Sequence, residues 1–222
     1  MSKDVKISPS ILSCDFGNLA DEVKRVEDAG ADAIHIDIMD GHFVRNLTMG
    51  PKIVAAIKRN TSLPLDVHLM IYNPFEYVEK FVSSGADSIT FHFEATEEIQ
   101  ATLDYIKKCN IQSGLAFNPE TSLSMIPKYL DKCDMLLLMT VHPGFGGQEF
   151  IPDVLDKIQF TRDLCDKCNL PLPIQVDGGI NLETARECAK AGATNFVSGT
   201  HLFQQKEMKQ AIENLRKAAE LR

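Results

Sequence analysis

Histidine and aspartate alternate with isoleucine in the segment HIDIMDGHFV, which begins at His35. Successive side chains of an extended chain point to opposite faces, so His35 and Asp37 share one face and the isoleucines share the other. By the same rule, the segment LDVHLM turns His68 away from its apolar neighbours, and the segment PIQVDGG does so for Asp177. Two imidazoles and two carboxylates on the polar faces of three strand-like segments form a set that can bind a divalent metal ion.

The alternative is that these four side chains are ordinary buried polar residues with hydrogen-bond partners. That reading suits a single histidine, but two carboxylates in one dry site raise each other's pKa and are costly to bury unpaired. A cation removes the cost, so we predict one divalent ion per subunit, with zinc first and iron, manganese or cobalt as alternatives. His92 and Glu94 share a face around another strand-like segment. His92 could be a fifth ligand or could support the ligands, and we expect a supporting or structural role.

Glycine-rich turns follow the last three strand-like segments, as VHPGFGGQ, DGGI and SGTHLF. Glycine lets backbone N–H groups approach an anion closely, and such a site needs no Lys or Arg. Three such turns on neighbouring loops predict a grip on a small phosphate. The residues that form it are Gly144, Gly146, Gly147, Gly178, Gly179, Gly199 and Thr200. Ser10, at the end of the first strand-like segment, could hydrogen-bond the substrate or cap a turn.

Eight strand-like runs alternate with polar, helix-like stretches. They cover residues 5–10, 33–39, 65–70, 88–93, 112–117, 135–141, 172–177 and 195–199. Gly30, Gly85 and Gly192 each stand between a helix-like stretch and a strand-like run, where a helix C-cap needs a left-handed residue. Their separations of about 55 and about 107 residues are close to two and four units of ~27 residues. Eight such units fill the chain and predict a parallel sheet closed into a TIM (β/α)8 barrel with outer helices.

An open doubly wound sheet is the rival architecture. It would want a G-x-G-x-x-G turn after the first strand, and SILSCDFGN lacks one. No Pro-, Gly- or Ser-rich linker divides the chain, so residues 1–222 are predicted to form a single catalytic domain. Barrels of this kind carry their chemistry at the C-terminal ends of the strands, which is where the polar faces described above end.

The composition narrows the class of partner. With 222 residues and a net charge of −8, the chain is not expected to bind nucleic acid or an acidic membrane. The N-terminal MSKDVKISPS lacks the apolar region of a signal peptide, and no apolar run approaches the ~18 residues of a membrane span. Of six cysteines, only Cys165 and Cys168 form a close pair, which is weak evidence for zinc or redox chemistry. We expect reduced thiols and a cytoplasmic protein.

Asp37 and Asp177 belong to strands far apart around the predicted barrel, so they can face a bound substrate from opposite sides. A metal that clamps an α-hydroxycarbonyl lowers the cost of forming an ene-diolate. One aspartate can then remove a proton while the other returns one to the opposite face. The predicted chemistry is epimerisation at a carbon next to a carbonyl. Met39, Met70 and Met139 lie near this site and either fill the core or form an apolar lid over a reactive intermediate.

Together these segments resemble the ribulose-phosphate 3-epimerase family over nearly the whole chain. The matching motifs are SPSILSCDF, GADAIHIDIMDGHFVRN, DVHLM, NPF, GLAFNPET, MTVHPGFGGQ, VDGGI, AGA and FVSGT. The resemblance implies an isomerase of pentose phosphate metabolism that interconverts D-ribulose 5-phosphate and D-xylulose 5-phosphate. It implies one divalent metal on the four ligands above, with Asp37 and Asp177 as the acid/base pair. The substrate contacts it implies are Ser10, His68, Gly144, Phe145, Gly146, Gly147, Asp177, Gly178, Gly179, Gly199 and Thr200. Family members often self-associate, so a homo-oligomer is expected.

Some positions depart from the family pattern. Arg45 stands where the family usually has proline, His142 replaces asparagine or glutamate, and His201 adds bulk in the segment GTHLF. None of the three is a predicted metal ligand, and His42 and His201 are expected in loops.

Three other functions remain as alternatives. The nearest is a 3-epimerase of a six-carbon ketose phosphate such as D-allulose 6-phosphate, although VDGGI and PGFGGQ look more like the pentose enzyme. An aldolase-type lyase, metal-dependent or not, is the second. The Schiff-base kind needs an inward lysine near the C-terminal end of a strand, and only Lys6 is a candidate, at the wrong end. The third is a catalytically inactive binding barrel, which the intact set of four ligands argues against.

Overall fold

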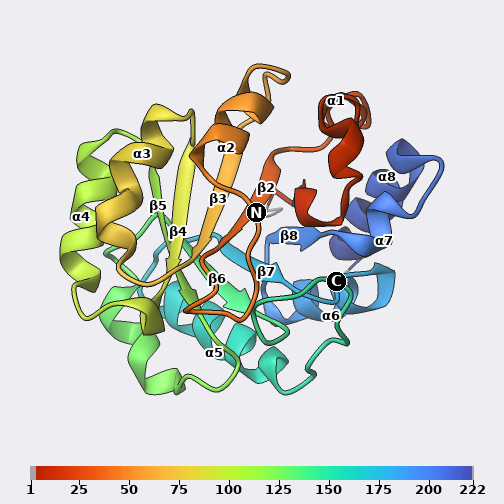
Figure 1. Cartoon of the computed structure of the whole chain (residues 1–222). Helices are drawn as coiled ribbons and strands as arrows, with labels where there is room; N and C mark the ends of the chain where they lie inside the picture. Colours follow the sequence, from red (N-terminus) through yellow and green to blue (C-terminus); the bar gives the residue numbers. More distant parts are fainter. Residues whose placement is uncertain (1–3, 222) are drawn as a thin grey trace.

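Eight parallel strands form the centre of the molecule, and helices surround them (Figure 1). The structure is a computed structural model, and it describes residues 4–221. The strands are β1 (Lys6–Pro9), β2 (Ile34–Met39), β3 (Leu65–Met70), β4 (Ser88–His92), β5 (Gln112–Phe117), β6 (Met135–Met139), β7 (Ile174–Asp177) and β8 (Asn195–Ser198). They pair in the order β1-β8-β7-β6-β5-β4-β3-β2, and a parallel bridge between Ser10 and His35 links the two ends. The sheet is therefore a nearly closed barrel, which confirms the predicted fold class.

α-Helices follow most of the strands. They are α1 (Leu19–Asp28), α2 (Pro51–Lys58), α3 (Val78–Ser83), α4 (Ile99–Lys108), α5 (Val154–Lys167), α6 (Leu182–Ala191), α7 (Thr200–Phe203) and α8 (Met208–Glu220). Between β5 and β6 the chain forms a 3₁₀ helix, η5 (Leu123–Tyr129), instead of the α-helix that the repeat predicts. Pro127 lies inside η5 and lacks the N–H that an α-helix would use.

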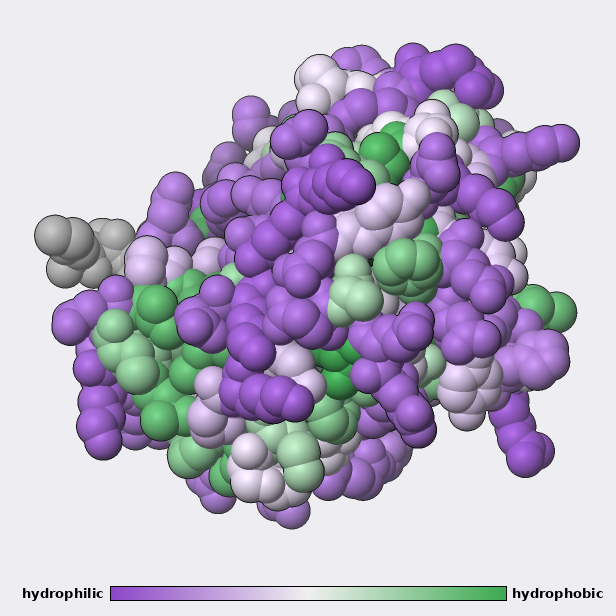
Figure 2. All heavy atoms as spheres, turned by 90° about the vertical axis from the view of Figure 1, so that its left-hand side faces the viewer, coloured by the Kyte–Doolittle hydropathy of each residue, from purple (hydrophilic) through white to green (hydrophobic). Residues whose placement is uncertain are grey.

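Strand β2 has an apolar outer face and a mainly polar inner face. Ile34, Ile36 and Ile38 of β2 belong to the large apolar core between the strands and the helices, and all three are buried. Burying an isoleucine contributes roughly 1.5–3 kcal/mol, so this face fixes which way the strand is turned. The inner face must then take the polar residues of the same strand. Figure 2 shows that the outer surface over α3 and α4 is mainly hydrophilic, apart from a hydrophobic group at the lower left of the view.

The register between β2 and β3 aligns the predicted ligands. His35 is paired with Asp66, and Asp37 with His68, in the parallel ladder. Because paired residues of parallel strands turn to the same face, an imidazole lies beside a carboxylate at both positions. One residue of slip would turn all of them toward the apolar core, so the isoleucine pattern also fixes this alignment.

The helix ends agree with the repeat that predicted them. Gly30, Gly85 and Gly192 have φ angles of 81°, 97° and 113°, in the region that favours glycine. Gly192 is the C-cap of α6, and the other two follow the C-caps of α1 and α3. Among the described residues, no helix has both the length and the apolar character needed to cross a membrane.

Candidate metal and substrate site

The four predicted metal ligands meet at the C-terminal end of the barrel. One ligand atom from each of His35, Asp37, His68 and Asp177 lies within 4.8 Å of the other three. Asp37 Oδ1 is 3.3 Å from His35 Nε2 and 3.1 Å from His68 Nδ1. Asp177 Oδ2 is 3.8 Å from both of these nitrogens. Ligand atoms of a tetrahedral site with bonds of about 2.1 Å are about 3.4 Å apart, so these spacings suit one small cation.

The environment of His35 also fits a metal. Its Nδ1 lies 2.8 Å from Asp66 Oδ2, a carboxylate oxygen, so Nδ1 carries a proton. Its Nε2 is buried and has no hydrogen-bond partner among the described residues, yet it faces the Asp37 and Asp177 carboxylates. Burial alone would lower the pKa of His35, but Asp37 and Asp66 outweigh it and raise the pKa well above its usual range. The metal-free site thus attracts positive charge to the position that a cation would take.

The two candidate catalytic carboxylates differ in acidity. Burial alone would raise the pKa of Asp37, but the charge and the hydrogen bond of His35 outweigh it and hold the pKa below its usual range. Ser10 adds a hydrogen bond of 2.6 Å from its hydroxyl to Asp37 Oδ2. Burial and the negative charge of Asp37 raise the pKa of Asp177 to about 7. Near neutral pH the metal-free pair therefore contains one carboxylate and one carboxyl that retains a proton part of the time, which is a pattern typical of acid–base catalysis.

The other two buried histidines are neutral at physiological pH. Burial lowers the pKa of His68, and it lowers the pKa of His92 to about 4. Burial alone would raise the pKa of Glu94, but hydrogen bonds from His92 and Thr121 hold it below its usual range. An ionised Glu94 therefore lies behind two neutral imidazoles.

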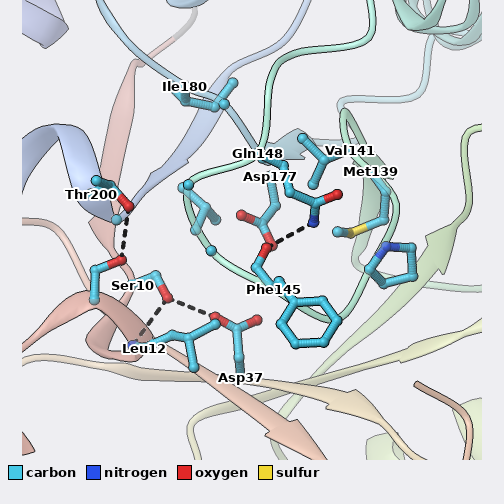
Figure 3. A pocket seen from close by; sticks show the side chains of 18 of the residues that line it. Ser10, Leu12, Asp37, Met139, Val141, Phe145, Gln148, Asp177, Ile180 and Thr200 are labelled. Carbon is cyan, nitrogen blue, oxygen red and sulfur yellow. Dashed lines mark hydrogen bonds between the residues drawn. The ribbon is translucent and has the colours of Figure 1, made fainter. Parts of the chain in front are cut away.

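A pocket of about 430 Å³ opens above the ligands, a volume that suits a small phosphorylated sugar. Figure 3 shows the side chains of Asp37, from β2, and Asp177, from β7, at this pocket, with Ser10 directed at Asp37. The three predicted methionines, Met39, Met70 and Met139, line the pocket and are almost fully buried. They form an apolar wall beside the carboxylates.

Ser10 takes the capping role that the sequence left open, and it also binds Asp37; its contact with a substrate stays a prediction. Its hydroxyl donates to Asp37, and its oxygen accepts from the backbone N–H of Leu12, which caps η1 (Ile11–Ser13) (Figure 3). Because the one hydroxyl proton is used on Asp37, Ser10 holds that carboxylate in place and lines the substrate pocket as well.

The predicted glycine turns line the other side of the pocket. Two glycines of the turn after β7 are required by the fold itself. Gly178 has φ 115°, and a Cβ there would lie 2.3 Å from a Val141 methyl; Gly179 has φ 65°, and its Cβ would lie 2.8 Å from the backbone nitrogen of Phe150. Gly146 differs, because a Cβ there would meet only Ser13 Oγ at 3.7 Å. Glycine at 146 is therefore not explained by packing within the chain.

Two residues of the site were missed in the sequence. Asp66 holds His35 through Nδ1 and also accepts from Gln175 Nε2 at 2.8 Å. It lies two residues before His68 on the same face, so the alternation rule could have found it. Gln148 donates to the carbonyls of His142 and Phe145 and so closes the loop after β6 (Figure 3). No periodic signal marks a loop contact of this kind.

Four further residues discussed in the sequence lie outside the ligand set: three histidines and one arginine. His42 lies in the bend after β2, as expected. The expectation of a loop for His201 was wrong, because it is the second residue of α7, where it lines the pocket. His142 is exposed and lies 2.6 Å from a Glu120 carboxylate oxygen. Arg45 is exposed.

Comparison with known proteins gives a family. The model of the Ribulose-phosphate 3 epimerase family matches residues 6–203. The chain is 52% identical to the ribulose-phosphate 3-epimerase of Chlamydia pneumoniae, covering 91% of this chain and 89% of the relative. It is 47% identical to the enzyme of that name from Bacillus subtilis strain 168, covering 96% and 98%. For the one from Escherichia coli strain K12 the identity is 43%, over 96% of both chains.

Solved structures support the fold. A variant of the tryptophan synthase alpha-subunit from Pyrococcus furiosus superposes with a TM-score of 0.70 over 100% of this chain and 99% of that one, at 18% identity. Thiamine phosphate pyrophosphorylase from the same organism gives a TM-score of 0.65 over 99% and 97%, also at 18% identity. At such low identity these likenesses concern the barrel alone.

Proposed function

The chain belongs to the ribulose-phosphate 3-epimerase family, and from this premise we propose how its residues divide the work of epimerisation. Its activity is that of an isomerase that interconverts D-ribulose 5-phosphate and D-xylulose 5-phosphate. The observation that carries the assignment of roles is a pair of carboxylates, Asp37 of β2 and Asp177 of β7. Both line one pocket, and their pKa values are pushed apart (Figure 3).

In the proposed reaction, Asp37 and Asp177 are the catalytic residues. The ionised one accepts the proton from C3 of the ketose phosphate, and an ene-diolate forms with its negative charge on the substrate oxygens. The protonated one then donates to the opposite face of C3, which inverts the centre. In the reverse direction the two residues exchange roles, as microscopic reversibility requires.

The four residues His35, Asp37, His68 and Asp177 would hold one divalent ion, and zinc is proposed because two nitrogen and two oxygen ligands at tetrahedral spacing suit it. When bound, the ion would stabilise negative charge on the substrate oxygens and so lower the barrier to proton removal. Iron, manganese and cobalt fit the same donor atoms. Metal analysis of the purified protein decides among them.

The remaining substrate contacts are proposed from the lining of the pocket. Backbone N–H groups of the glycine turns at 144–147, 178–179 and 199–200 would bind the phosphate, in loops that commonly serve this purpose in such barrels. Phe145 and the three methionines would cover the sugar and keep water from the ene-diolate. Ser10 lines the pocket and would contact the substrate beside Asp37. His68 is fully buried and is not a lining residue, so its substrate contact is proposed from the family resemblance alone.

We also propose that the chain works as one catalytic domain, in the cytoplasm, and as a homo-oligomer. Cys14, Cys109, Cys133, Cys168 and Cys188 are free thiols, which suits a reducing compartment. Exposed apolar side chains support self-association. Leu47 and Tyr72 are exposed, and the backbone of each contacts Asp40; Phe75 is also exposed and packs against Tyr105 in a tilted arrangement. Analytical ultracentrifugation measures the oligomeric state.

Exchange with deuterated water tests the two-base scheme. Because the proton returned to C3 is not the one removed, product formed from either substrate should carry solvent deuterium at C3. Nuclear magnetic resonance of the sugar phosphates measures this directly. Product that keeps its original C3 hydrogen in full would rule out the roles proposed for the two aspartates. D-ribulose without phosphate is the control for the phosphate contacts, and it should be turned over poorly.

A further inference from the structure

A chain of hydrogen-bonding side chains leads from the metal ligands to Glu94. His68 Nδ1 faces the ligand cluster, and its other ring nitrogen, Nε2, lies 2.9 Å from Nε2 of His92. Nδ1 of His92 lies 3.3 Å from Oε2 of Glu94. Both imidazoles are fully buried, and their rings stack with centroids 4.9 Å apart. The proposed epimerisation uses neither the buried His92 nor the partly buried Glu94, so these two groups need another explanation.

The direction of the protons in this chain follows from its outer end. A carboxylate can only accept, so His92 must donate to Glu94 from Nδ1. Neutral His92 then has a lone pair on Nε2, and this atom accepts a hydrogen bond from Nε2–H of His68. Neutral His68 is thereby left without a proton on Nδ1. Nδ1 and Asp37 Oδ1, at 3.1 Å, are then two acceptors facing each other, and a cation between them removes the conflict.

Glu94 is held in place firmly enough to set this direction. Its other oxygen, Oε1, accepts hydrogen bonds from the backbone N–H of Asn118, at 2.9 Å, and from the hydroxyl of Thr121. Lys157 of α5 is buried and binds the carbonyls of Asn118, Pro119 and Thr121 at 2.7, 2.8 and 2.8 Å. The loop after β5 therefore fixes the orientation of the carboxylate, and Oε2 remains for His92.

We propose that Glu94 and His92 are positioning residues that hold Nδ1 of His68 unprotonated and directed at the metal. The inference rests on the metal site proposed above. His35 has a shorter version of the same arrangement, in which Asp66 binds Nδ1 directly and leaves Nε2 for the metal. Both histidine ligands would thus have the ligating nitrogen chosen by a carboxylate, directly by Asp66 for His35 and through a second imidazole by Glu94 for His68.

Two substitutions test the chain by metal affinity. In Glu94→Gln, the amide oxygen keeps the hydrogen bonds from Asn118 and Thr121, so the NH₂ group faces His92. The NH₂ group then donates to Nδ1 of His92, His92 donates from Nε2 to Nε2 of His68, and the proton of His68 moves to Nδ1. His92→Phe removes the acceptor for His68 while keeping a ring. Each should weaken zinc or cobalt binding about 10–100-fold in chelator competition, the usual cost of losing such a partner. The matched control is Thr90→Val: Thr90 precedes His92 on the same inner face, is fully buried, and its hydroxyl has no partner among the described residues.

A measurement on the unmodified metal-free protein keeps the inference testable if the variants fold poorly. Nitrogen-15 spectra of the imidazoles report which ring nitrogen carries the proton. We expect the proton of His68 on Nε2, and in Glu94→Gln on Nδ1. A proton on Nδ1 of His68 in the unmodified protein, or unchanged metal affinity in both folded variants, would overturn the inference. Failure of the unmodified protein to bind zinc or cobalt at all would instead overturn the metal site on which it rests.

Discussion

The two sides of the pocket are built in different ways. On one side, His35, Asp37, His68 and Asp177 lie on β2, β3 and β7, and their positions follow from strand register and side-chain hydrogen bonds. On the other, loops present glycines and backbone N–H groups, and the Phe145 side chain is 58% exposed. Proton transfer needs charged groups at fixed distances, whereas a phosphate needs many weak donors that can adapt to it. The strand side should therefore be sensitive to changes of functional group, and the loop side to changes of backbone shape.

The largest effect is expected from the two aspartates of the strand side. Asp177→Asn and Asp37→Asn keep the size of the side chain but remove its ability to accept a proton. The rate of epimerisation should fall by roughly 10²–10⁴-fold in each, the range typical of lost acid–base catalysis. Steady-state kinetics with D-ribulose 5-phosphate measures it.

The exchange reaction then separates the two roles. A variant that still exchanges the C3 hydrogen with solvent, without inverting the centre, retains one working base. If both variants kept at least half of the original rate, the strand side would not contain the catalytic groups, and the contrast drawn between the two sides would fail.

Removal of a single ligand is the next largest effect. His68→Ala leaves three of the four ligand atoms, so metal affinity and activity should fall together, each by about 10²-fold or more. Metal content after dialysis and the rate at saturating substrate are the two measurements. Full activity in protein stripped of metal would contradict the proposal for the ligand set. The loop-side variant described below is the control, because it touches no ligand.

The difference between strands and loops also explains which parts of the site could be predicted from the sequence. Alternation along β2 and β3 fixes which residues face inward, and burial of Ile34, Ile36 and Ile38 makes that choice energetically firm. The barrel and the meeting of the four ligand side chains could therefore be predicted. Asp66 follows the same alternation rule. It was not predicted because it is the second residue of β3, and the chemistry was expected at the C-terminal ends of the strands.

Loop geometry lies beyond such rules. Gln148 joins two carbonyls of its own loop, and Thr121 binds Glu94 from the loop after the neighbouring strand, β5, so neither contact has a periodic signature. The segment after β5 was expected to be an α-helix, but it forms a 3₁₀ helix that contains Pro127. The roles of the individual glycines in substrate binding stay predictions.

A smaller effect is expected when a side chain is added on the loop side. A Cβ at position 146 has room within the protein, so Gly146→Ala should fold normally. It should raise KM for the phosphorylated substrate by roughly tenfold and leave kcat and metal content nearly unchanged, because only the approach of the anion is hindered.

The matched variant is Gly179→Ala, in which the Cβ would overlap the backbone of Phe150 and the residue has φ 65°. It should lower the free energy of unfolding by on the order of 1–3 kcal/mol. The pair distinguishes a glycine needed by the ligand from one needed by the fold. An unchanged KM in Gly146→Ala would remove this turn from the phosphate site.

The smallest expected effect concerns the stability of the metal-free protein between pH 5 and pH 7. Folding raises the pKa of Asp177 from its usual 3.8 to about 7, so in this interval the folded chain keeps a proton that the unfolded chain has lost. The stabilisation from this group is complete below about pH 4 and disappears as the pH rises through 7. For one proton, the free energy of unfolding should fall by up to about 1.4 kcal/mol per pH unit relative to Asp177→Asn, which has no such proton. Urea unfolding of both metal-free proteins at several pH values measures the difference. Parallel pH profiles would mean that Asp177 is as acidic in the folded protein as in the unfolded one, and that the strand side does not separate its two carboxylates into an acid and a base.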